Sequence, residues 1–188
     1  KRELFARFVK RMRDTLDPAA FLPAKLVEQL QRHARYAETN LEPNIKESAG
    51  GLRDLQTILW ISRAAQIGAN WRELARRGVI TAAEAREIQR HDQFLQSLRI
   101  RLHYCAGRRE DRLLFDFQSV LARDLGLYDR PHRLASEQLM QRYYLTAKAV
   151  SQLGTIVQQN LSARVMPAHD KEYHPINERF GARAEQLE

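Results

Sequence analysis

Cysteine is nearly absent from this sequence, and long apolar runs are absent too. One cysteine, Cys105, stands among 188 residues, which excludes an internal disulfide and leaves no cysteine-based zinc site. No apolar run approaches the roughly 20 residues of a membrane-spanning helix, and no signal peptide is visible. No repeat or low-complexity segment stands out either. We therefore expect a cytoplasmic protein of one domain, or of one domain with part of another.

Acidic residues are too few to balance the basic ones. Lysine and arginine together number 31, against 23 aspartates and glutamates, which gives a formal net charge of +8. Such an excess attracts phosphates, nucleic acid or acidic protein surfaces, but it does not choose among them. The alternative is that arginine-rich helices are simply solvated and have no specific partner. With 44% hydrophobic residues, the composition is that of a globular protein rather than a disordered one.

Apolar residues recur every three or four positions along most of the chain, and this spacing predicts helices. A capping box of Thr81 and Glu84 opens one long pattern. The apolar stripe of that helix suits the seam of a bundle and consists of Ile88, His91, Leu95, Leu98, Leu102 and Cys105. The sequence thus predicts a mainly α fold, an antiparallel helical bundle. The expected helices span about residues 1–16, 23–39, 52–67, 82–105, 115–125 and 136–164.

The segment "LEPNIKESAGG", residues 41–51, interrupts this helical pattern. Its proline and the isolated Ile45 predict a short extended strand, with Pro43 at a sheet edge or at the start of the strand. Gly50 and Gly51 then predict a turn directly before the next helix. The expected element is therefore a strand, a glycine turn and a helix.

A glycine turn that precedes a helix is a possible anion-binding site. It exposes backbone N–H groups and the positive end of the helix dipole, and Lys46 and Arg53 would add full charges. The spacing is not that of a Walker A loop. The alternative is that the glycines only permit a tight turn, and that Arg53 and Asp54 are surface residues of the first helical turn.

Two longer stretches carry a resemblance to a known family. "EPNIKESAGGLRDLQTILWISR" resembles the segment that joins the nucleotidyltransferase fold to the helical domain in the bifunctional PII uridylyltransferase and uridylyl-removing enzymes of bacterial nitrogen regulation. "LRIRLHYCAGRREDRLLFDFQSVLARDLG", followed by "LMQRYY", resembles the helical domain of the same family, in the same order. The two stretches cover about half of the chain.

This resemblance implies a function for a larger polypeptide. In such enzymes a nucleotidyltransferase domain related to DNA polymerase beta transfers uridylyl from UTP to the PII signal protein, a separate HD domain removes it, and ACT domains sense glutamine. The transfer relies on acidic residues that hold Mg²⁺. The defining Gly-Ser turn and Asp-x-Asp pair are absent from this chain, and we expect them upstream of Lys1. The chain is thus expected to be an inactive fragment that holds no metal, with Mg²⁺ and UTP bound only by the full-length enzyme.

The resemblance also assigns domains and site residues. Residues 1–46 would be the end of the nucleotidyltransferase domain, 47–165 the helical bundle domain, and 166–188 a tail or linker. Glu42 is the candidate for the third catalytic carboxylate. The expected nucleotide-binding residues are Asn44, Lys46, Gly50, Gly51, Arg53 and Asp54, and the expected basic surface is Arg101, His103, Arg108, Arg109 and Arg112.

Several alternatives accompany this assignment. In the loop "GRREDR", Asp111 and Arg112 are as well explained as a structural pair. His91 and Asp92 spell "HD", but a metal site would need further ligands, and His91 lies on the apolar stripe of its helix, so a partly buried structural histidine is the better interpretation. The expected partners are PII, UTP and the other domains. The alternative function is a basic helical spacer or binding module that recognises nucleic acid or an acidic protein.

Overall fold

The chain is mainly helical. A computed structural model describes residues 2–37, 41–166, 173–175, 181–183 and 186–187. Within these residues no helix is long and apolar enough to span a bilayer. The helices are α1 (Arg2–Thr15), α2 (Pro18–Tyr36), α3 (Leu52–Ala64), α4 (Trp71–Arg76), α5 (Ala82–Ala106), α6 (Phe115–Asp124) and α7 (Ala135–Val165).

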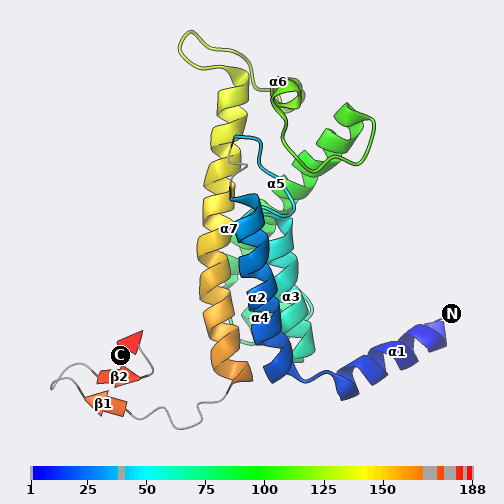
Figure 1. Ribbon diagram of the computed structural model, residues 1–188, viewed down its shortest axis with the longest axis vertical. Helices are drawn as coiled ribbons and strands as arrows, with labels where there is room; N and C mark the ends of the chain where they lie inside the picture. Colours follow the sequence, from blue (N-terminus) through cyan, green and yellow to red (C-terminus); the bar gives the residue numbers. More distant parts are fainter. Residues whose placement is uncertain (1, 38–40, 167–172, 176–180, 184–185, 188) are drawn as a thin grey trace.

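The long helices form a bundle. The chain passes up α2, down α3, up α5 and down α7 in the view of Figure 1, and α3 contacts α2, α5 and α7. α1 extends away from the bundle, and its apolar residues Leu4, Phe5 and Phe8 are exposed. Near the C-terminus, β1 (Tyr173–Pro175), β2 (Gly181–Arg183) and β3 (Gln186–Leu187) pair as a small antiparallel sheet. The prediction of a mainly helical chain is therefore confirmed.

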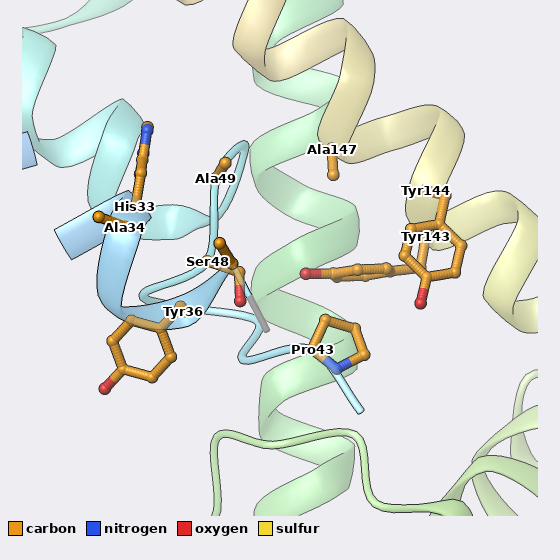
Figure 2. Close-up of a pocket in the computed structure, with 10 residues that line it drawn as sticks. His33, Ala34, Tyr36, Pro43, Ser48, Ala49, Tyr143, Tyr144 and Ala147 are labelled. Atoms are coloured by element: carbon orange, nitrogen blue, oxygen red, sulfur yellow. The ribbon is translucent and has the colours of Figure 1, made fainter. Parts of the chain in front are cut away.

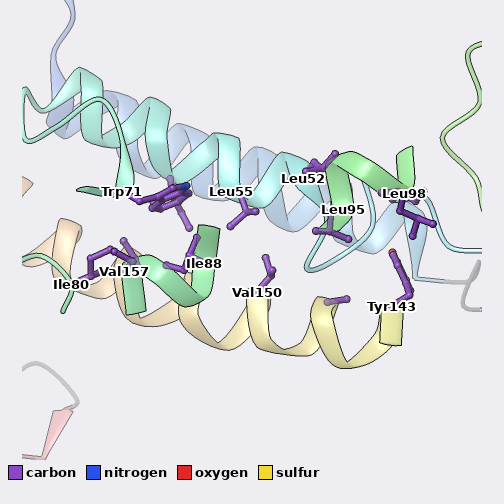
Figure 3. Packing of buried hydrophobic residues seen from close by; sticks show 14 of the residues in the cluster. Leu52, Leu55, Trp71, Ile80, Ile88, Leu95, Leu98, Tyr143, Val150 and Val157 are labelled. Atoms are coloured by element: carbon purple, nitrogen blue, oxygen red, sulfur yellow. The ribbon is translucent and has the colours of Figure 1, made fainter. Parts of the chain in front are cut away.

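The core lies where α3, α5 and α7 meet. Four residues of the stripe predicted on α5 are fully buried there, whereas His91 and Cys105 are half-buried. α7 faces this stripe with Leu139, Tyr143, Val150 and Val157, each no more than 1% exposed. Figure 3 shows Tyr143, Val150 and Val157 of α7 turned toward α3 and α5.

Two helices differ from the prediction. α2 begins at Pro18, not at Pro23, because the side chain of Asp17 accepts a hydrogen bond from Ala19 N–H and a proline fits the first helical position. Pro23 lies inside the helix, which continues through it. The short helix α4 was not predicted; its first turn is capped by Asn70, whose side chain accepts from the Glu73 amide.

The strand predicted around Ile45 is wrong. Residues 41–51 are turns, with one isolated antiparallel bridge between Asn44 and Arg112. The cause is the Asn44 side chain, whose Oδ1 accepts hydrogen bonds from the amides of Lys46 and Glu47 and so folds the backbone into a turn. The nucleotidyltransferase origin of residues 1–46 and the domain boundaries at 46 and 165 stay predictions.

Candidate functional site

Two distant segments are joined beside the end of α2. The amide of Ile45 donates to the carbonyl of Asp111 at 2.8 Å, and the amide of Leu113 donates to the carbonyl of Pro43 at 2.9 Å. These bonds lay the turn that precedes α3 against the loop between α5 and α6. The two stretches that carry the basic residues of interest are therefore neighbours in space.

A polar groove of about 600 Å³ opens between α2, this turn, α3 and the loop before α6. Six of its lining side chains are lysine or arginine and three are acidic, so the groove has the sign that attracts an anion. Arginine and lysine are the residues that bind phosphate most often. The lining residues are Lys25, Glu28, Gln31, Arg32, Arg35, Tyr36, Asn44, Lys46, Glu47, Arg53, Trp60, Arg109 and Asp111.

Glu47 orders the cations of the groove. Its carboxylate lies 2.9 Å from Lys46 Nζ, 3.1 Å from Arg53 Nη2 and 3.8 Å from Arg32 Nε. Burial alone would raise the pKa of Glu47, but hydrogen bonds from Arg53 and Lys46 outweigh it and lower the pKa. One carboxylate thus holds three cations close together, and because Arg32 also pairs with Asp54, about one net positive charge of this cluster is left for a ligand.

Asp54 occupies the buried centre beneath the turn. Arg32 Nη2 donates to it at 2.7 Å, His33 Nε2 lies 2.9 Å from the carboxylate, and the Gly50 amide donates to it at 2.7 Å. Burial would raise the pKa of Asp54, but the hydrogen bonds from His33 and Arg32 prevail and lower it. Asp54 does not line the groove, and its contacts connect α2 to the turn.

The amides at the start of α3 have partners within the chain. Leu52 N–H donates to Ile45 O at 3.1 Å, Arg53 N–H to Lys46 O at 2.8 Å, and Asp54 N–H to Gly51 O at 3.1 Å. With these amides occupied, positive charge reaches the groove from side chains rather than from the helix N-terminus.

The two glycines of the turn are explained by close packing. Gly50 has a φ of +74°, and a Cβ there would lie 2.0 Å from the carbonyl oxygen of Ala147. A Cβ on Gly51 would lie 2.7 Å from the carbonyl oxygen of Ile45. These contacts give both glycines a structural reason to be glycine, and their nucleotide-binding role stays a prediction.

The residues of the predicted basic surface have acidic partners within the chain, and the role of this surface stays a prediction. Of its five residues, only Arg109 lines the groove. Arg101 pairs with Asp124, Arg108 with Glu110, and His103 with Asp111. The expected pair of Asp111 with Arg112 is not the one formed, because Asp111 binds Arg99 at 2.6 Å.

Arg112 is instead paired with Glu42, the candidate catalytic carboxylate. Glu42 Oε2 accepts from Arg112 at 3.2 Å, and Glu42 Oε1 accepts from the Phe115 amide at the start of α6 at 3.0 Å. Both carboxylate oxygens are therefore used within the chain. Glu42 does not line the groove.

Sequence reasoning missed an aromatic side chain that lines the groove, Trp60. Lys25 Nζ lies 5.3 Å from the centre of the Trp60 ring, and the Arg53 guanidinium carbon lies 5.2 Å from it, both within cation–π range. Helical spacing in the sequence could have indicated that these residues share a surface. Lys25 and Arg32 are seven residues apart, as are Arg53 and Trp60, so each pair lies on one face of its helix.

The "HD" pair on α5 is not part of a metal cluster. His91 Nε2 lies 3.7 Å from Glu87, its helical neighbour, and the side chain of Asp92 accepts from Gln96. In the part of the chain that the structure describes, no group of three or more His, Cys, Asp or Glu residues is placed to hold a metal ion.

A helical bundle with a cation-lined groove defines the molecule as a helical module suited to an anionic ligand. The comparisons with known proteins make this specific. A family model described as GlnD PII-uridylyltransferase matches residues 20–157, and the chain belongs to this family. The resemblance carried by the two sequence stretches is thereby confirmed.

Curated relatives agree with this assignment. Proteins called bifunctional uridylyltransferase/uridylyl-removing enzyme are 57% identical over 167 residues in Burkholderia thailandensis and 53% identical over 188 residues in Nitrosospira multiformis. These alignments cover 88% and 99% of this chain, but only 20% and 21% of the relatives. The chain thus spans about a fifth of the length of the proteins it matches. No solved structure matches it.

Proposed function

We propose that this chain is a non-catalytic helical part of a uridylyltransferase/uridylyl-removing enzyme, and that its groove binds the triphosphate of UTP while its outer surface helps to place PII. The observation that carries the proposal is the convergence of six cationic side chains on one groove. The names of the relatives support the reaction class.

The groove suits binding rather than chemistry. Lys46 and Arg53 are already held by Glu47, so a phosphate group would meet pre-positioned donors. The described residues do not fit the Mg²⁺ that such a transfer requires, because they hold no cluster of metal-ligating side chains. The proposal therefore assigns the metal ligands and the reacting atoms to other parts of the full-length enzyme.

The test is steady-state uridylylation by the full-length enzyme with Lys46→Ala or Arg53→Ala. Loss of a charged phosphate contact should raise KM for UTP about tenfold or more, with a smaller effect on thermal unfolding. Arg101→Ala is the matched control, because Arg101 pairs with Asp124 and does not line the groove. Kinetics that are unchanged in both variants would reject the triphosphate role.

A second candidate is a basic module that binds nucleic acid. The observation in its favour is Trp60, an aromatic side chain within cation–π range of both Lys25 and Arg53. Proteins that bind single-stranded nucleic acid combine such cations with aromatic rings on which bases stack. Binding of a labelled single-stranded oligonucleotide that weakens steeply with salt would support it. Absence of such binding, with UTP kinetics sensitive to Lys46, would leave the first proposal.

A further inference from the structure

A second cavity lies between α2, the turn and α7. Its volume is about 520 Å³, which is within the range of small-molecule pockets. His33 and Ala34 contribute from α2, Pro43 and Ser48 from the turn, and Tyr143 from α7. Figure 2 shows the Tyr143 ring extending from α7 toward the turn that carries Ser48.

The walls of this pocket suit an uncharged, flat ligand. Among the residues that the structure describes, no lysine, arginine, aspartate or glutamate lines it. The imidazole of His33 also lines it, and Nε2 of that ring lies 2.9 Å from the Asp54 carboxylate. Three tyrosines and a proline supply broad ring surfaces, and the rings of Tyr143 and Tyr144 meet edge to face, 5.4 Å apart. Aromatic walls pack best against planar rings.

One polar group of the residues that form the pocket wall lacks a partner. The side chain of Tyr143 is 1% exposed, and among the described residues its hydroxyl has no hydrogen-bond partner. Burial raises the pKa of this phenol strongly, so the hydroxyl keeps its proton and is a donor. Ser48 Oγ accepts from the Asn44 amide and thus keeps its own proton to donate. A buried donor without an acceptor is unfavourable, and an acceptor on a ligand would satisfy it.

We propose that this pocket binds a neutral planar ring that carries a carbonyl oxygen, a lactam-type heterocycle, with the Tyr143 hydroxyl donating to that carbonyl. The proposal does not depend on the proposed function, because the groove and this pocket are lined by different residues, except for Tyr36, which lines both. The chemistry is shared by free lactam rings and by the base of a nucleotide.

The test measures the binding of 2-pyridone to the full-length protein by saturation-transfer NMR. We expect binding to the wild type that is about fivefold weaker in Tyr143→Phe, which removes the donor and keeps the ring. Indole, which has no carbonyl, should bind both proteins equally. Ala34→Leu, which fills the exposed mouth of the pocket, should weaken both probes.

A second measurement separates a ligand site from an ordinary buried hydroxyl. Without ligand, Tyr143→Phe should leave the melting temperature unchanged or raise it, because it removes an unsatisfied donor. A lower melting temperature would show that the hydroxyl is already satisfied, and it would overturn the proposal. So would 2-pyridone binding that is absent or that is insensitive to both Tyr143→Phe and Ala34→Leu.

Competition distinguishes the two sources of the ring. Displacement of 2-pyridone by UTP would identify the base of a nucleotide as the occupant, and retention would identify a free ring; either result supports the site. Failure of the proposed function has a separate readout, because it would appear as UTP kinetics that do not respond to Lys46→Ala or Arg53→Ala.

Discussion

At the scale of single residues, Gly50 is where the turn comes closest to α7. In Gly50→Ala, a positive φ is combined with a contact 2.0 Å from the backbone of Ala147, and we expect unfolding free energy to fall by about 3 kcal/mol or more. Gly126→Ala is the matched control, because Gly126 has a similar φ of +76°, but a Cβ added there would have no heavy atom of the described residues within 4 Å. It should lose only about 1 kcal/mol. If urea unfolding gave the same loss of free energy for both variants, the close contact with Ala147 would have no energetic cost.

Asp54 makes stability depend on pH. Because its folded pKa lies below the ordinary value of 3.8, its stabilising contribution is complete above that value and is lost as pH falls through the folded pKa. Asp54→Asn should cost about 3 kcal/mol near neutral pH and should flatten the loss of stability below pH 4. Asp92 is the contrasting control: burial raises its pKa, so Asp92→Asn should remove a loss that occurs as pH rises. Unfolding curves at a series of pH values would test both signs.

At the scale of elements, helix ends that are set by local side chains are the simplest to predict and to perturb. The Thr81 side chain accepts from the Glu84 amide, and Glu84 accepts from the Thr81 amide. Thr81→Ala should lower the unfolding free energy by about 1 kcal/mol. Thr155→Ala, an exposed change inside α7, should stay within about 0.5 kcal/mol of the wild type. A thermal-unfolding comparison that ranks them the other way would contradict the capping role.

These elements show how far sequence reasoning extends. The apolar stripe of α5 could be predicted because the spacing of its apolar residues and its capping box both lie within a single segment of the sequence. The start of α2 could not, because Pro18 and Pro23 satisfy the same rule and the Asp17 cap decides between them. The strand predicted around Ile45 does not form, because the Asn44 side chain accepts hydrogen bonds from the backbone amides that a strand would pair with its neighbour. Lys46 and Arg53 of the groove were found from local charge, whereas Lys25 and Arg35 required the packing of α2 on α3.

At the scale of the whole molecule, Glu42 connects the turn to α6. Glu42→Ala would remove charge-assisted hydrogen bonds to the Phe115 amide and to Arg112, and we expect the unfolding free energy to fall by about 2 kcal/mol. Glu87→Ala, which removes only a loose surface contact with His91, should cost less than about 0.5 kcal/mol. Urea unfolding at neutral pH would measure both, and a loss no larger in Glu42→Ala than in the control would contradict this connection.

The same connection has a consequence for how the groove comes into existence. The contact between Glu42 and Phe115 joins positions 73 residues apart, so closing it requires the intervening helices to have folded back on themselves. Lys46 and Arg53 lie near the start of that long loop, and Arg109 and Asp111 lie near its far end. A ribosome that has released this part of the chain only as far as about residue 100 would therefore expose the basic turn without the complete groove. Ligand affinity should arise in a single step once the loop before α6 has emerged.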